Sequence, residues 1–255
     1  MLLTIDAGNT QTVLGLFAAE ALVAHWRITT QRDWTPDEYR LWLRGLLSLE
    51  GYGREDLTGI AVSSVVPHAT SAMREIVSDL VDGPAVFVEP GVKTGMPILI
   101  DNPREVGADR LVNSVAAVAR YGTPAVVVDF GTSTNFDVVS AAAEYIGGVI
   151  AAGLEVSHNA LISATAQLRR VELRPPRSVI GKGTVEAIQS GLLYGHAGQV
   201  DGIVERLSAE LGDDPIVIAT GGLAATIAPY CRTIDRIDEF LTLEGLRLIY
   251  ERNTE

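Results

Sequence analysis

The sequence predicts an α/β protein made of two similar domains, residues 1–118 and 119–255. Short apolar segments alternate with stretches of helical periodicity, the order of segments restarts after Tyr121, and an Asp-x-Gly motif follows the first apolar segment of each half. The 255 residues are 47% hydrophobic, which is enough apolar material for two modest cores. A disordered or low-complexity chain is therefore excluded for the bulk of the sequence.

The first half predicts a β-meander followed by alternating helices and strands. Thr35 is an expected N-cap, because Pro36 and two acidic residues follow it at the positions that favour a helix start. A glycine- and proline-rich loop is expected at 89–103. Strands are expected at 1–5, 12–17, 22–28, 60–66 and 85–88, and helices after Thr35 and at 67–80 and 106–121.

The second half repeats this pattern after a short connection, Tyr121-Gly122-Thr123-Pro124, which is expected to form a tight hinge. Strands are expected at 124–128, 135–140, 145–150 and 216–219, and helices at 156–168, 185–211 and 240–251.

Composition limits the partners of this chain. Its formal net charge of −12 disfavours nucleic acid and anionic membrane surfaces, and no apolar run approaches the roughly 18 residues of a membrane span. A single cysteine, Cys231, gives no support to an oxidising compartment, and the N-terminal segment lacks a signal-peptide pattern, so we expect a cytoplasmic protein. One basic stretch is either a solvated patch or an anion-binding surface: Arg169, Arg170, Arg174, Arg177 and Lys182.

The two Asp-x-Gly motifs, beginning at Asp6 and Asp129, are the most informative feature of the sequence. Both end an apolar strand and precede hydroxyl or amide residues and a second strand. Glycine allows close approach of a ligand, following N–H groups donate to phosphate oxygens, and a carboxylate at a strand end can hold a cation. Each motif alone is more typical of a simple hairpin turn, but two matched copies favour two domains that bind one nucleotide between them.

A third segment agrees with a nucleotide site. Strand 216–219 runs into Thr220-Gly221-Gly222, where bare backbone could accept a base or ribose, although a simple strand-to-helix turn explains the glycines equally well. Near Lys182, an apparent phosphate-binding P-loop is incomplete, and no Gly-x-Gly-x-x-Gly motif opens a helix after a strand.

A set of motifs in fixed order resembles the type III pantothenate kinases over nearly the whole chain. The motifs are Asp6-Ala7-Gly8-Asn9-Thr10, Gly107-Ala108-Asp109-Arg110, Asp129-Phe130-Gly131-Thr132, Gly147-Gly148-x-Ile150, Gly181-Lys182-x-Thr184 with Gln189-Ser190-Gly191, and Thr220-Gly221-Gly222. The resemblance implies two ribonuclease H-like domains of the actin-like ATPase fold around a nucleotide cleft, in a homodimer. It also implies ATP-dependent phosphorylation of pantothenate to 4'-phosphopantothenate, the first step of coenzyme A biosynthesis.

The same resemblance implies roles for individual residues. The ATP phosphate loop would comprise Asp6, Ala7, Gly8, Asn9, Thr10, Gln11, Thr12 and Val13, and Thr132 would also contact ATP. Asp6 would lie near the Mg²⁺ of Mg-ATP and hold it through water, and Asp129 would bind K⁺ or NH₄⁺. Pantothenate would be bound by Gly107, Ala108, Asp109 and Arg110, with Asp109 as the proton acceptor, and by Thr184 from the opposite subunit.

The residue chemistry of this segment is consistent with a kinase. Phosphoryl transfer needs a positioned hydroxyl and a carboxylate that takes its proton, and Asp109 at an expected helix start can supply the carboxylate. Arg110 can bind a substrate carboxylate through a two-pronged hydrogen bond. Taken alone, the Asp109–Arg110 pair is more typical of an ion pair at a helix start than of a substrate site.

Four positions depart from the family pattern: Ile100, Asn135, Ala152 and Gly183. Ile100 replaces a frequent tyrosine near pantothenate, so the substrate pocket could be altered. Three other functions stay open: a kinase of the same fold acting on another small hydroxy acid or sugar, a non-catalytic regulatory member of the family, and a heat-shock-type ATPase. The last normally requires an additional peptide-binding domain, for which 255 residues leave no room.

Overall fold

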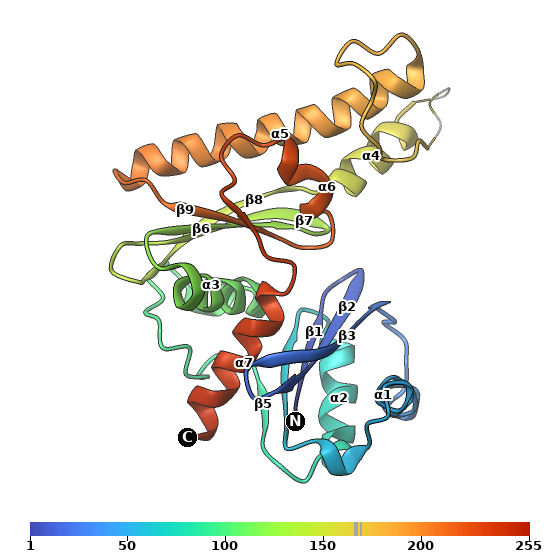
Figure 1. Cartoon of the computed structure of the whole chain (residues 1–255), viewed down its shortest axis with the longest axis vertical. Coiled ribbons are helices and arrows are strands. Elements are labelled where there is room, and N and C mark those ends of the chain that lie inside the picture. Colours follow the sequence, from blue (N-terminus) through green and yellow to red (C-terminus); the bar gives the residue numbers. More distant parts are fainter. Residues whose placement is uncertain (166–167, 169) are drawn as a thin grey trace. The chain divides into compact units, whose positions relative to one another are not determined.

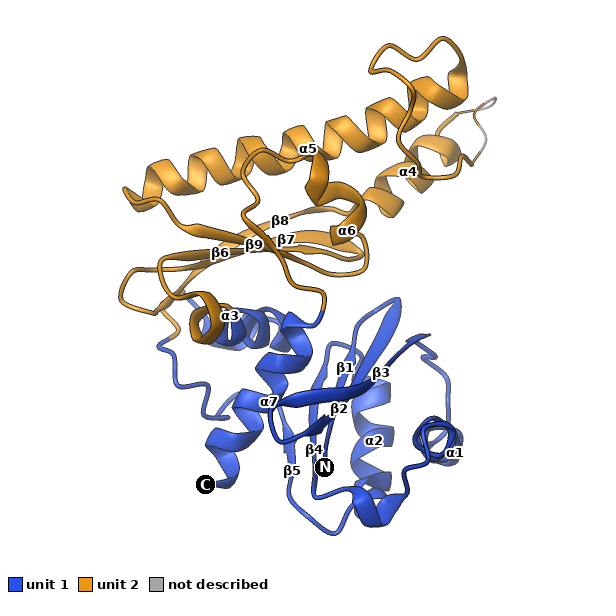
Figure 2. Cartoon of the chain, viewed as in Figure 1, with its two compact units in different colours: residues 1–97, 101–116, 240–255 blue, residues 98–100, 117–239 orange. Residues whose placement is uncertain are grey.

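The computed structural model describes residues 1–165, 168 and 170–255, and it divides into two compact units (Figure 2). Unit 1 contains residues 1–97, 101–116 and 240–255, and unit 2 contains residues 98–100 and 117–239. Each unit is an α/β structure built on one five-stranded sheet.

The sheet of unit 1 has the strand order β3-β2-β1-β4-β5. Strands β1, β2 and β3 form the expected antiparallel meander, whereas β4 and β5 run parallel to β1. The central strand β1 is buried on both faces, and the edge strand β3 alternates between exposed and half-buried residues, as its position requires. The strands are β1 (Leu2–Ala7), β2 (Gln11–Ala18), β3 (Ala21–Thr29), β4 (Gly59–Ser64) and β5 (Ala85–Phe87).

Helices α1 (Pro36–Leu49) and α2 (Pro67–Leu80) pack on one face of this sheet and enclose its main core (Figure 1). Thr35 caps α1 as expected, and Glu38 completes a capping box by accepting from the backbone N–H of Thr35 at 2.7 Å. Helix α7 (Leu241–Thr254) packs against β1, β2 and β4. Two short 3₁₀ helices occupy Arg54–Asp56 and Pro103–Glu105, and α3 spans Ala108–Tyr121.

The sheet of unit 2 has the order β10-β9-β6-β7-β8, in which β6, β7 and β8 are antiparallel and β9 and β10 run parallel to β6. Its strands are β6 (Ala125–Phe130), β7 (Ser133–Val139), β8 (Tyr145–Ala152), β9 (Ile216–Thr220) and β10 (Arg236–Ile237). Helices α4 (Leu154–Ser163), α5 (Thr184–Leu211) and α6 (Ala224–Ile227) contribute to the core on this sheet, with a 3₁₀ helix at Ala228–Tyr230.

The two units repeat one topology, which confirms the fold class expected from the sequence. Strands β1, β2, β3, β4 and β5 correspond in order and direction to β6, β7, β8, β9 and β10. Strands β1 and β6 also have the same burial pattern, in which only the penultimate residue, Asp6 or Asp129, is half-buried. Strand β10 was not expected from the sequence, because two residues carry no periodicity.

The compact units differ from the expected domain ranges at the C-terminus. The expected boundary between residues 118 and 119 falls within α3, and α7 belongs to unit 1. The physical reason is close helix packing: a Cβ on Gly245 of α7 would lie 2.7 Å from Cγ1 of Val112 and closer still to its carbonyl oxygen. Apolar periodicity predicts that such a helix buries one face, but it does not specify which sheet receives that face. The division at 118/119 stays a prediction about where the repeat begins.

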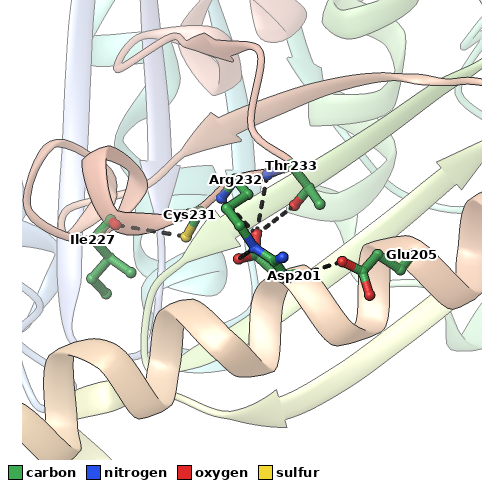
Figure 3. A network of polar contacts seen from close by, with 6 residues as sticks. All are labelled: Asp201, Glu205, Ile227, Cys231, Arg232 and Thr233. Carbon is green, nitrogen blue, oxygen red and sulfur yellow. Dashed lines mark hydrogen bonds and ion pairs between the residues drawn. The ribbon is translucent and has the colours of Figure 1, made fainter.

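A buried carboxylate, Asp201 of α5, fixes the segment that connects α6 to β10 (Figure 3). It accepts hydrogen bonds from the backbone N–H groups of Arg232 and Thr233 at 2.8 and 3.1 Å and from the hydroxyl of Thr233 at 3.0 Å, and it pairs with the guanidinium of Arg232. Burial opposes ionisation of Asp201, but these hydrogen bonds outweigh it and lower its pKa. Burial and the charge of Asp201 raise the pKa of Cys231 to about 12, so this thiol is not a nucleophile at neutral pH.

Candidate active site

The first expected phosphate loop is the exposed turn between β1 and β2. The backbone N–H of Gly8 donates to the carbonyl of Gln11 at 3.0 Å, and Asn9 and Thr10 are exposed at the tip. Thr30 anchors the base of the turn, because its hydroxyl donates to the carbonyl of Gly8 at 2.7 Å and lies 2.9 Å from the hydroxyl of Thr12. The turn therefore presents backbone groups to solvent on a rigid support, as a phosphate loop requires.

Asp6 lies two residues before this turn, at the end of β1. It is half-buried and pairs in register with Val13 on β2 and with Ser63 on β4. In-register neighbours on parallel strands direct their side chains to the same face of the sheet. The hydroxyl of Ser63 is therefore on the face of the sheet that carries the Asp6 carboxylate.

The expected substrate segment forms the start of α3 in the same unit. The carboxylate of Asp109 folds back and accepts from the backbone N–H of Arg110 at 2.9 Å, while the same N–H donates to the carbonyl of Gly107 at 3.1 Å. A Cβ on Gly107 would lie 2.5 Å from Oδ1 of Asp109, so glycine makes the room for this carboxylate. Burial raises the pKa of Asp109, and its hydrogen bond and charge interaction with Arg110 only partly offset that effect.

A carboxylate in this environment is suited to accept a proton. Burial raises its pKa and makes it a stronger base than an exposed aspartate, while the backbone N–H and the charge of Arg110 act in the opposite direction. Its position at a helix start, beside Arg110, also combines a base with a cation that can hold an anionic substrate.

The second Asp-x-Gly motif forms the turn between β6 and β7 in unit 2. The N–H of Gly131 donates to the carbonyl of Ser133 at 3.0 Å, and the N–H of Gly153 donates to the carbonyl of Thr132 at 3.1 Å. A Cβ on Gly153 would lie 2.6 Å from the carbonyl of Gly131. Thr132 is exposed, so the turn is held by its backbone and leaves this side chain accessible.

The Thr220-Gly221-Gly222 turn at the end of β9 packs directly against Asp129. Gly221 has a φ of +90°, and a Cβ there would lie 2.8 Å from the backbone N and O of Phe130 and closer still to Oδ1 of Asp129. Asp129 pairs in register with Thr220, whose hydroxyl is buried. The structure thus brings together two motifs, Asp129 and Thr220-Gly221, between which the sequence had indicated no contact.

Thr184 is the exposed first residue of α5. The preceding segment is tied to this helix, because Gln189 donates to the carbonyl of Glu172 at 2.8 Å and Ser190 donates to that of Val179 at 2.6 Å. Gly181 packs on the first turn of the helix, where a Cβ would lie 2.6 Å from the backbone of Glu186. These contacts hold the segment before Thr184 against α5.

The basic stretch before α5 is partly neutralised. Arg177 pairs with Glu186 at 2.5 Å, and Arg174 lies 4.0 Å from Glu172, both on the exposed surface. Arg169 falls outside the described residues. Exposed pairs of this kind contribute little to stability, and an anion-binding surface at this stretch stays a prediction.

The departures from the family pattern lie on or beside β8, apart from Gly183, which is the N-cap of α5. Segment 98–100 joins β8, since the N–H of Leu99 donates to the carbonyl of Tyr145 at 2.8 Å, and Ile100 lies next to Gly147. Gly147 has a φ of +120°, and a Cβ at this position would lie 3.7 Å from Cγ2 of Ile100. Ala152 pairs with Ser133, whose hydroxyl donates to the side chain of Asn135 at 2.9 Å.

The expected site residues therefore fall into two sets. Unit 1 holds the loop 6–13 together with Gly107–Arg110, and unit 2 holds Asp129, Thr132 and Thr184. Convergence of the two hairpins on one triphosphate stays a prediction. The sequence did not indicate Ser63, and it indicated Thr220 only as part of the Thr220-Gly221-Gly222 motif, with no function for its hydroxyl. The signal that could have indicated both is a hydroxyl at the end of each parallel strand beside an Asp-x-Gly strand.

Within the described residues, no group of three or more His, Cys, Asp or Glu side chains could hold a metal ion. A cation at Asp6 or Asp129 would therefore need hydroxyl, carbonyl, phosphate or water oxygens in addition to the single carboxylate, which is a donor set that suits Mg²⁺ and K⁺. The described helices include none of the length and apolar character needed to cross a membrane.

The family model for type III pantothenate kinase matches residues 2–206. The chain belongs to this family. A type III pantothenate kinase of Streptomyces avermitilis is 57% identical over 99% of this chain and 98% of its own length. Another, from Moorella thermoacetica, is 52% identical over the full length of both proteins.

Solved structures of similar fold support the same architecture. A structure from Campylobacter jejuni, described as a Baf family transcriptional activator, has a TM-score of 0.61 at 18% identity and covers 98% of each chain. The (R)-2-hydroxyglutaryl-CoA dehydratase component A of Acidaminococcus fermentans has a TM-score of 0.58 at 14% identity, with 100% of this chain and 99% of that one covered. At these identities the likeness shows the fold alone, which is the two-domain actin-like ATPase fold expected for this pantothenate kinase family member.

Proposed function

We propose that this pantothenate kinase family member transfers the γ-phosphoryl group of ATP to the 4'-hydroxyl of pantothenate, which is the first step of coenzyme A biosynthesis. The observation that carries the proposal is full-length relationship to type III pantothenate kinases at 52–57% identity, in a chain that retains the acid at position 109. We expect the enzyme to work in the cytoplasm, where ATP is available.

Asp109 is the proposed catalytic base. It accepts the proton of the pantothenate hydroxyl as that oxygen attacks the γ-phosphorus, and the bond from the γ-phosphorus to the β,γ-bridging oxygen breaks to release ADP. Its raised pKa supports this role, because proton transfer to a stronger base is more favourable. Arg110 holds the pantothenate carboxylate and so orients the hydroxyl.

The remaining expected residues bind ATP and its cations. The loop 6–13 and Thr132 hold the phosphates through backbone N–H and hydroxyl groups. Asp6 holds Mg²⁺ through water, and Asp129 holds a monovalent cation, K⁺ or NH₄⁺. When bound, these cations offset the negative charge of the phosphates.

We also propose a homodimer in which Thr184 contacts the substrate of the partner subunit. The exposed face of α5 that begins with Thr184 carries small residues at helical spacing: Ala187, Gly191, Gly195 and Gly198. Such a face allows another helix to approach closely. Apolar side chains are also exposed beside it, with Val185 at 51% and Ile180 at 80% exposure.

Oligomeric state tests this surface directly. Gly195→Arg should convert the dimer to a monomer in size-exclusion chromatography with light scattering and abolish kinase activity. Gly45→Arg is the matched control, because Gly45 is also an exposed glycine within a helix and has no atom within 4 Å of a Cβ position. A dimer that persists in Gly195→Arg would rule out this face.

The activity itself is tested with purified protein, Mg-ATP, KCl and pantothenate. ADP formation should match phosphopantothenate formation one to one, and Asp109→Asn should abolish both without unfolding the protein. ADP release that ignores pantothenate would indicate an ATPase, turnover of a different hydroxy acid or sugar would indicate a related kinase, and an inert dimer would indicate a regulatory protein.

A further inference from the structure

Two buried hydroxyl groups lack a hydrogen-bond partner within the described residues: Oγ of Ser63 and Oγ1 of Thr220. Their residues are 0% and 1% exposed. Buried polar groups are normally hydrogen-bonded, so each exception requires an explanation.

The other buried threonine and serine residues that the structure describes do have partners. Thr4 donates to the carbonyl of Gly15 at 3.2 Å, and Thr134 lies 3.2 Å from Nε2 of His196. Further partnered hydroxyls are those of Thr12, Thr30, Thr94, Ser114 and Ser190. The sheets therefore satisfy buried hydroxyls readily, and the two exceptions are not a general property of these strands.

Both exceptions occupy the same position in the repeated topology. Ser63 on β4 is the in-register neighbour of Asp6 on β1, and Thr220 on β9 is the in-register neighbour of Asp129 on β6. Each hydroxyl therefore lies on the same face of its sheet as the carboxylate of an Asp-x-Gly motif.

Of the two buried hydroxyls, that of Thr220 is the better candidate for a cation ligand, because of where Asp129 lies. The carboxylate of Asp129 packs so closely on Gly221 that a Cβ there would overlap Oδ1. It therefore lies against the residue that directly follows Thr220. A carboxylate oxygen and a hydroxyl oxygen on one face, at the end of adjacent parallel strands, form a partial oxygen shell for a hard cation.

We propose that Oγ1 of Thr220 is a ligand of the monovalent cation that Asp129 holds. The hydroxyl coordinates the cation through a lone pair, which accounts for its burial without a protein acceptor or donor. This inference rests on the proposed cation site, but it assigns the second protein ligand of that site to a different strand. The cation would then join β6 to β9 at the end of the sheet.

The test uses Thr220→Val, which removes the hydroxyl and keeps the branched shape, and Thr220→Ser, which retains the hydroxyl. Ser63→Ala is the matched control, since it removes the corresponding buried hydroxyl of the other unit. Melting temperature is measured in KCl and in choline chloride at equal ionic strength, with and without the non-hydrolysable analogue β,γ-imido-ATP.

The wild-type protein should melt at a higher temperature in KCl than in choline chloride. Thr220→Val should lose this difference, with an affinity for K⁺ at least tenfold weaker, and should melt no lower than wild type in choline chloride. Thr220→Ser and Ser63→Ala should retain the K⁺ response, and Asp129→Asn should lose it. The K⁺ concentration that gives half-maximal kinase activity should rise at least tenfold in Thr220→Val.

An unchanged K⁺ response in Thr220→Val would overturn the inference, as would a wild-type protein whose melting temperature ignores K⁺ in every condition. Equal loss in Ser63→Ala would also overturn it, because the effect would then follow from removing any buried hydroxyl. The proposed function is judged separately: a protein that binds K⁺ through Thr220 but does not phosphorylate pantothenate would refute the activity and leave the ligand assignment intact.

Discussion

Replacing Gly221 tests whether the end of β9 must approach Asp129 closely. Alanine at this position should lower the free energy of unfolding for two separate reasons. Its φ of +90° is unfavourable for any residue with a Cβ, and the new methyl group would overlap the Asp129 carboxylate and the backbone of Phe130. Gly122→Ala isolates the first cost, since Gly122 has a φ of +87° and no atom within 4 Å of a Cβ position.

The backbone cost is about 1–2 kcal/mol for either variant. The overlap adds about 1–3 kcal/mol for Gly221→Ala, because Phe130 is held in the sheet and only the carboxylate is able to move. To regain van der Waals distance the carboxylate must shift by about 1 Å. At about 2–4 °C per kcal/mol for a chain of this size, Gly122→Ala should melt about 2–8 °C below wild type and Gly221→Ala about 4–20 °C below.

Activity separates the two variants more sharply. A displacement of about 1 Å in a group that positions the reactants can cost about 100-fold in rate, so Gly221→Ala should lose that much kcat/KM while Gly122→Ala stays within about threefold of wild type. Calorimetry and a coupled ADP assay measure both effects. Equal stability and equal activity in the two variants would refute the idea that the Asp129 carboxylate depends on a bare backbone at position 221.

The described contacts support three further predictions. Asp109→Asn should raise the melting temperature at pH 8 and not at pH 4. The pKa of Asp109 is raised in the folded state, so the folded state loses stability as pH rises and this carboxyl ionises. An equal change in melting temperature at both pH values would contradict this reasoning. Asp201→Asn should lower the free energy of unfolding in urea by about 1–3 kcal/mol at pH 7. This loss should shrink as pH falls below 3.8, the ordinary pKa of an aspartate. The pKa of Asp201 is lowered in the folded state, so its carboxylate stabilises the fold only while it is ionised. Gly245→Ala should lower the free energy of unfolding by about 1–3 kcal/mol, because its Cβ meets the backbone of Val112. Gly45→Ala, in open space on α1, should instead raise it by about 0.5–1 kcal/mol. A change of the same sign in both variants would refute the packing argument.

Local chemistry made most of the fold predictable. Thr35 and Pro36 mark the start of α1, and Pro67 marks that of α2, because caps and prolines act within one helical turn. The repeated Asp-x-Gly strands indicated a duplicated topology, and the strand orders of the two sheets confirm it.

Features that depend on long-range packing could not be predicted from the sequence. The placement of α7 in unit 1 depends on how closely Gly245 approaches Val112, and sequence periodicity carries no information on that distance. The buried hydroxyls of Ser63 and Thr220, which lack a hydrogen-bond partner among the described residues, could not be predicted for a similar reason. A serine or threonine at a strand end is common, and only the structure reveals whether its hydroxyl has a partner.

The recurrence of the acid–hydroxyl pair is difficult to explain by packing alone. Leaving a buried hydroxyl unsatisfied costs about 1–3 kcal/mol, so two of them take a noticeable part of a total stability of about 5–15 kcal/mol. Independent packing defects have no physical reason to occur twice beside the penultimate residue of the central strand, yet Ser63 and Thr220 both do. A bound cation or its water shell would recover that free energy in each unit. The repeat therefore places a carboxylate and a buried hydroxyl on one face of each sheet, whereas the proposed base, Asp109, comes from a helix start whose motif has no second copy in the sequence.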